Sequence, residues 1–161
     1  MLADSSTPPP ESQMEHLSED PLYPLLADSA GAVEYGRYIF PTIAHALLAA
    51  QFSKKNICQH IVVARSPCMA KKIAVGYMHL VRKDWDAVEG TITKAIFRAK
   101  LAQHPCVRKA LLSLTDEVAV KKAESSLLFR FISPEHWKIW LELSKELAEC
   151  RCDREVVLLC A

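Results

Sequence analysis

Residues 40–52 read FPTIAHALLAAQF, and this stretch sets the expected fold class. Thr42 carries the short hydroxyl side chain that favours a helix N-cap, and the run after it is almost wholly apolar. An apolar run of this length after a cap predicts a largely buried helix. A mainly α-helical fold is therefore expected to form around this segment.

Four further helices are expected from N-cap residues, N1 prolines and apolar residues at three- and four-residue steps. Their predicted ranges are 67–75, 85–103, 106–114 and a long last helix from 134 onward. Upstream, residues 33–39 (VEYGRYI) surround Gly36 and predict one or two short strands. The predicted fold class is mainly α, an α+β arrangement with a minor β element near the N-terminus, in one compact single domain.

The 161 residues are 50% apolar and 24% charged, which excludes a largely disordered chain and fits one domain. Residues 1–20 are rich in Ser, Pro and acidic side chains, and they are expected to form a disordered arm. The helical domain is predicted over 21–150. Residues 151–161 are expected to be a C-terminal tail, either a strand or a loose end.

The formal net charge of +1 conceals an uneven distribution along the chain. Residues 1–40 carry a net charge of −6, whereas residues 51–130 carry a net charge of +9. Lys and Arg near helix starts favour phosphate-bearing ligands, although solvated helix faces give the same composition. Few aromatic residues lie among these bases, so a nucleic-acid partner is not expected.

The chain lacks the features of a secreted, membrane-spanning or metal-binding protein. No apolar run reaches 18 residues and no basic segment precedes an apolar one at the N-terminus. We therefore expect an intracellular, cytoplasmic protein with reduced cysteines and no membrane partner. Cys150, Cys152 and Cys160 lie close together, but no fourth ligand has a fitting spacing, so neither a metal nor a cofactor is expected.

Five short motifs, in order, resemble those of the NADAR family, whose members are linked to NAD and ADP-ribose chemistry. Residues 40–45 (FPTIAH) and 50–52 (AQF) are similar to its aromatic-Pro-Thr-x-Glu-His and Ala-x-Lys-Phe steps. Similar segments follow at 64–71, 81–88 and 95–115. The family includes N-glycosidases that act on riboflavin-pathway intermediates. The resemblance implies a helical NADAR-like fold over roughly residues 21–125.

The departures from the family pattern fall where the chemistry is expected. The glutamate expected to drive glycosidic cleavage aligns with Ala44, and the lysine of the Ala-x-Lys-Phe step is Gln51. A glycine-rich loop is replaced by residues 119–130. Cleaving an N-glycosidic bond develops oxocarbenium character that needs a carboxylate, which alanine cannot supply. No catalytic residue is therefore assigned, and Glu124 is only a substitute candidate.

The resemblance implies ligand-binding roles for four residues that match family positions: His45, Arg82, Trp85 and Lys100. Each has a structural alternative. His45 fits a satisfied buried histidine, Trp85 fits core packing at a helix start, and Lys100 fits an ordinary surface charge.

Three functions remain open from the sequence. The first is a catalytically impaired NADAR-like domain that binds a phosphoribosyl or ADP-ribose type of ligand. The second is an active N-glycosidase with a relocated carboxylate, for which Glu124 and Glu34 are candidates. The third is a non-catalytic, partner-binding helical domain. A truncated or mis-spliced gene model would also explain the missing loop and the tail CRCDREVVLLCA.

Overall fold

The computed structural model describes residues 18–114 and 116–159, with side chains through residue 151. It divides the chain into two compact units. One contains residues 27–105 and is called the hairpin unit here. The other, the terminal unit, combines the described residues before 27 with those from 106 onward. Most of the expected arm, residues 1–17, lies outside the described residues.

The hairpin unit opens with two antiparallel strands, β1 (Val33–Tyr35) and β2 (Tyr38–Phe40). Val33 pairs with Phe40, and both side chains are buried. Gly36 lies in the turn with a φ of +63°, a left-handed conformation that glycine adopts without a Cβ penalty. The prediction of short strands around Gly36 is confirmed.

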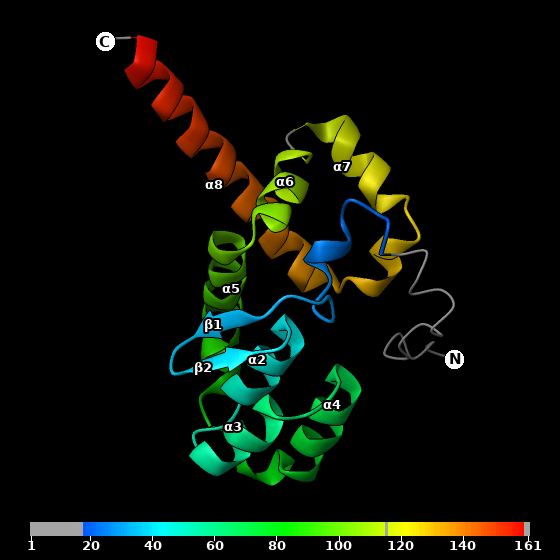
Figure 1. Cartoon of the computed structure of the whole chain (residues 1–161), viewed down its shortest axis with the longest axis vertical. Helices are drawn as coiled ribbons and strands as arrows, with labels where there is room; N and C mark the ends of the chain where they lie inside the picture. The colour runs from blue at the N-terminus through cyan, green and yellow to red at the C-terminus, as the bar shows by residue number, and fades with distance from the viewer. Residues whose placement is uncertain (1–17, 115, 160–161) are drawn as a thin grey trace. The chain divides into compact units, whose positions relative to one another are not determined.

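Helix α2 (Ile43–Ala50) lies at the centre of the hairpin unit. The side chain of Thr42 caps it by accepting a hydrogen bond from the amide of His45. The helix contacts both strands and helices α3 (Lys55–Val62), α4 (Pro67–Gly76) and α5 (Trp85–Gln103) (Figure 1). The expected burial is confirmed at Ile43, Ala46 and Ala49.

Of the helices around α2, α4 and α5 agree with the predictions from capping residues and apolar periodicity. Ser66 caps α4 by accepting from the amide of Met69 at 3.2 Å, and Pro67 occupies the first turn as predicted. The predicted bounds of α5 agree with the structure. Helix α3 was not expected, because Lys54 at its N-cap position makes no side-chain cap. A one-turn 3-10 helix, η2 (Met78–Leu80), links α4 to α5.

The terminal unit is built from η1 (Tyr23–Leu25), α6 (Pro105–Leu112), α7 (Glu117–Glu124), η3 (Leu128–Phe131) and α8 (Pro134–Leu159). Trp140 of α8 is fully buried, and its indole Nε1–H donates to the carbonyl of Leu25 at 3.0 Å. This bond ties α8 to a segment 115 residues earlier.

In the C-terminal half, the structure adds detail to one expectation and corrects another. The segment aligned with the family's glycine-rich loop is occupied by α7 and η3, and α7 is capped by Asp116, whose carboxylate accepts from the amide of Ala119 at 2.7 Å. Helix α8 continues to Leu159, so the backbone over 151–159 is neither a strand nor a loose end (Figure 1). The last two residues lie outside the described chain. The fold class itself, mainly α with a minor β element, is confirmed.

Candidate functional site

The first turn of α2 carries the position at which the family resemblance places a catalytic glutamate. That position is Ala44, which is half-buried. Its amide donates to the carbonyl of Ala27 at 2.9 Å, so the segment before β1 satisfies one of the free donors at the helix start. The methyl group of Ala44 offers no proton acceptor to a ligand.

His45 is buried and both of its ring nitrogens have partners in the protein. Nδ1 lies 2.9 Å from Oγ1 of Thr42, and Nε2 lies 3.1 Å from the carbonyl oxygen of Ala64. A carbonyl can only accept, so Nε2 carries the proton and Nδ1 accepts from the Thr42 hydroxyl. The ring therefore joins the cap of α2 to the segment before α4. This arrangement corresponds to the structural alternative considered for His45.

Lys100 is almost completely buried, and a surface-charge role is thereby excluded. Its ammonium group donates to the carbonyl of Ala30 at 3.4 Å and also to the carbonyl of Gly31. A buried ammonium requires such acceptors, because its desolvation is otherwise strongly unfavourable. Lys100 thus holds the 30–31 segment against the C-terminal part of α5.

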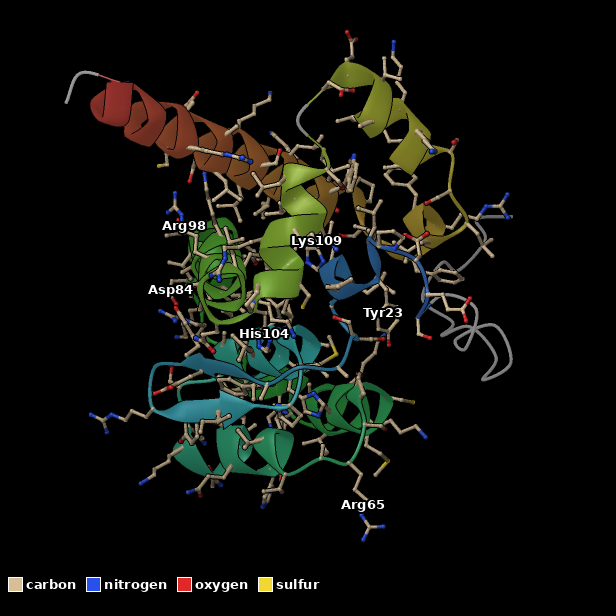
Figure 2. The ribbon with its side chains drawn as sticks, turned by 45° about the horizontal axis from the view of Figure 1, so that its top comes forward. Tyr23, Arg65, Asp84, Arg98, His104 and Lys109 are labelled. Carbon is tan, nitrogen blue, oxygen red and sulfur yellow. The ribbon has the colours of Figure 1, made fainter. Side chains whose placement is uncertain are left out.

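The last residues of α5 extend this attachment along the entry to β1. Gln103 exchanges two hydrogen bonds with the main chain of Glu34, at 2.8 and 2.9 Å. The His104 Nε2 atom donates to the carbonyl of Ala32 at 2.5 Å, and Figure 2 shows His104 beside the strands. Sequence reasoning did not identify either role, since each joins residues about 70 positions apart.

Arg82 forms a bidentate ion pair with Asp84. Its Nε and Nη2 atoms donate to the two carboxylate oxygens at 2.6 and 2.7 Å. The hydrogen bonds to Arg82 hold the pKa of Asp84 below its ordinary value, and they raise the pKa of Arg82. Asp84 occupies the N-cap position of α5 but makes no side-chain cap, because this pair engages its carboxylate. Trp85 follows, half-buried, in the first turn of α5.

The four predicted binding residues therefore divide between the two ends of α2. The amide of Arg82 donates to the carbonyl of Gln51 at 2.9 Å, at the C-terminal end of the helix. His45 lies in its first turn, roughly 9 Å away along the axis at 1.5 Å per residue. Lys100 binds the 30–31 segment. This segment follows Ala27, whose carbonyl contacts the first turn of α2.

Neither substitute carboxylate belongs to α2. Glu124 belongs to the terminal unit, and its Oε1 atom accepts from the indole Nε1–H of Trp137 at 3.0 Å. Glu34 belongs to β1, and its exposed side chain projects from a strand whose main chain is bound by Gln103.

One carboxylate that sequence reasoning overlooked lies next to the start of α2. Asp28 directly follows Ala27, the residue whose carbonyl binds Ala44. The residue is exposed, yet desolvation by neighbouring protein atoms raises the pKa of its carboxyl above the ordinary value. Electrostatic interactions with His45 and then with Lys71 of α4 lower the pKa of Asp28, and desolvation outweighs them. No local motif marks Asp28, because its neighbours come from α2 and α4.

The comparison with solved structures identifies one match of the same fold. It is the NMR structure of the Escherichia coli protein YbiA, a NADAR family member, with a TM-score of 0.63. The match covers 84% of this chain and 83% of YbiA at 18% sequence identity. The fold is NADAR-like. No family model matches the chain, and no curated protein matches it by sequence.

The described residues also lack two other features. None of their helices combines the length and apolar character needed to cross a membrane. Nor do three His, Cys, Asp or Glu side chains gather as a metal site among the described residues.

Proposed function

We propose that this chain is a NADAR-like domain that binds a small phosphorylated ribosyl compound and is catalytically impaired as an N-glycosidase. Ala44 carries the second half of this proposal. It lies in the first turn of α2, where the family resemblance places the catalytic glutamate. Losing such a carboxylate lowers the rate of proton-transfer chemistry by about 10²–10⁴.

The charge of the hairpin unit supports a phosphate-bearing ligand. Residues 53–83, which include α3 and α4, contain seven Lys and Arg and no Asp or Glu. Arg65 in this stretch is exposed and extends away from the ribbon (Figure 2). A surface of one sign raises the local concentration of anionic ligands and speeds their association.

The relocated-carboxylate alternative receives less support from the two glutamates considered for it. Glu124 is engaged with Trp137, and Glu34 lies on a strand rather than at the start of α2. The partner-binding alternative predicts that no sugar phosphate binds.

Two measurements test the proposal. Titration calorimetry with ribose 5-phosphate and ADP-ribose should show binding, and the absence of heat with both would favour a partner-binding domain instead. Hydrolysis of a ribosylaminopyrimidine phosphate should remain at the uncatalysed rate, so turnover typical of an enzyme would contradict the impairment.

A gain-of-function variant sharpens the second measurement. The double variant Ala44→Glu with Gln51→Lys restores both family residues, and it should raise hydrolysis by about 10²-fold. Val118→Glu is the matched control, because it adds a carboxylate at an exposed position of α7. Hydrolysis that rises equally in both variants would refute a specific role for the α2 position.

A further inference from the structure

The two edges of the β1–β2 sheet have different surroundings. Strand β1 contacts α5 (Figure 1), and the side chain of Gln103 exchanges two hydrogen bonds with the main chain of Glu34, at 2.8 and 2.9 Å. The side-chain amide of Gln103 thus takes the place that a neighbouring strand would take. Both main-chain groups of Glu34 are engaged, so this edge of the sheet is covered.

The same two hydrogen bonds show which main-chain groups lie at the edge of β2. The N–H and C=O of a strand residue point to the same side, so those of Glu34 point away from β2. Glu34 is paired with Ile39 in the register of the hairpin. The two residues therefore form a non-hydrogen-bonded pair, and the N–H and C=O of Ile39 point away from β1.

The edge at Ile39 is uncovered within the described part of the chain. Helices α2 and α3 contact β2, but no donor or acceptor in residues 18–114 and 116–159 binds the outward main-chain groups of Ile39. Ile39 is also 64% exposed, although its side chain is large and apolar. An open edge that carries an exposed apolar side chain is a template for pairing with another chain.

The charges around this edge favour an acidic partner. Arg37 precedes β2 in the hairpin turn, is exposed, and has no ion-pair partner among the described residues. Lys54 and Lys55 are exposed at the start of α3, which contacts β2. An extended segment with acidic residues on both sides of an apolar residue would complement these bases and Ile39 together.

We propose that the outer edge of β2 binds an extended acidic segment of a partner protein as an additional antiparallel strand. An apolar residue of the segment lies opposite Ile39 and exchanges two main-chain hydrogen bonds with it, and the flanking acidic residues face the bases. Pro41 follows β2 directly and has no N–H to donate, so the pairing is confined to a short segment. This interface goes beyond sugar phosphate binding and does not depend on it.

The test is an NMR titration of the full chain with the peptide acetyl-Glu-Thr-Val-Thr-Glu-amide. Its valine is the residue expected opposite Ile39, and its two glutamates flank the valine symmetrically. The peptide should shift the amide resonance of Ile39 and slow the exchange of its amide hydrogen with solvent, because that N–H gains an acceptor.

Two altered peptides separate the contributions to binding. Methylating the valine nitrogen removes the donor to the Ile39 carbonyl, and affinity should fall about fivefold. Replacing both glutamates with lysine should also weaken binding by about fivefold, since the bases then repel the peptide. Equal affinity for the methylated peptide would show that no strand forms and would refute the proposal.

Two pairs of protein variants locate the site. Arg37→Glu should weaken binding of the glutamate peptide about fivefold and improve binding of the lysine peptide, whereas Lys72→Glu, the same charge change at an exposed position of α4, should do neither. Ile39→Ala should weaken binding of the glutamate peptide about fivefold. Val75→Ala, at another exposed apolar position of α4, is its matched control. Equal effects within either pair would contradict the assignment to β2.

The spectrum of the protein without peptide supplies the last outcome. A resonance of Ile39 that moves with protein concentration would mean that a second copy of the chain occupies the edge, which would overturn the acidic-segment proposal. The absence of any shift at Ile39 with millimolar peptide would refute it too. Neither result bears on sugar phosphate binding, which titration calorimetry measures separately.

Discussion

Gly31 provides the sharpest test of how the entry to β1 is held. Its φ is +118°, which side chains rarely adopt, and a Cβ added there would lie 2.9 Å from Nζ of Lys100 and 3.2 Å from Cε1 of His104. Gly31→Ala therefore combines backbone strain with a clash against the ammonium group that binds this segment. The hairpin unit should be destabilised by both effects.

The magnitude follows from these two contributions. A non-glycine residue in a sparsely populated φ/ψ region costs about 1–3 kcal/mol. Moving Lys100 Nζ away from its carbonyl acceptors removes a charged hydrogen bond worth about 1.5–3 kcal/mol. Alanine also restricts the unfolded chain more than glycine does, which offsets about 0.4–1 kcal/mol of this loss. The net loss in the free energy of unfolding should be about 2–5 kcal/mol.

Two other glycines serve as matched controls. Gly36 has a φ of +63°, but a Cβ added there would meet open space, so Gly36→Ala introduces backbone strain alone and should cost about 1 kcal/mol. Gly90 lies within α5, also in open space, and Gly90→Ala should stabilise the protein by about 0.5–1 kcal/mol. Urea unfolding followed by circular dichroism measures all three. A Gly31→Ala cost no larger than that of Gly36→Ala would refute the attachment through Lys100.

Two further predictions concern stability. Because burial raises the pKa of Asp28, its contribution to stability is full below its ordinary pKa of 3.8 and is lost as pH rises through the folded-state pKa. Asp28→Asn should therefore be more stable than the wild-type protein at neutral pH. In urea unfolding, this difference in stability should vanish below pH 3.8. An equal difference at both pH values would contradict the prediction. Trp140→Phe removes the indole donor to the Leu25 carbonyl and leaves that acceptor buried. The free energy of unfolding should therefore fall by about 1–3 kcal/mol. An unchanged midpoint in urea unfolding would argue against this hydrogen bond.

Much of the fold could be predicted because its signals are local. Ser66-Pro67 starts α4 through a cap and a preset φ, and the apolar period of three and four residues gives the bounds of α5. Helix α3 has no capping side chain at its N-terminus, so no local signal predicted it. Helix α7 has one in Asp116, but the family resemblance led to the expectation of a replaced glycine-rich loop rather than of a helix.

The candidate site was less predictable. His45, Arg82, Trp85 and Lys100 were selected from motifs, yet Arg82 and Trp85 lie toward the opposite end of α2 from His45. A motif records order along the chain, and it does not record which end of a neighbouring helix a residue reaches. Glu124 illustrates the same limit, since its bond to Trp137 depends on how α7 meets α8.

The amino-acid sequence alone specified the helical class and the hairpin at Gly36, and it placed Ala44 where the family resemblance expects a glutamate, because each depends on residues within one turn or one short motif. Tertiary structure decided the rest. Lys100 became a buried donor only when the 27–34 segment packed against the start of α2 and the end of α5. Burial and electrostatics depend on neighbours in space, and these neighbours lie as many as 72 residues apart.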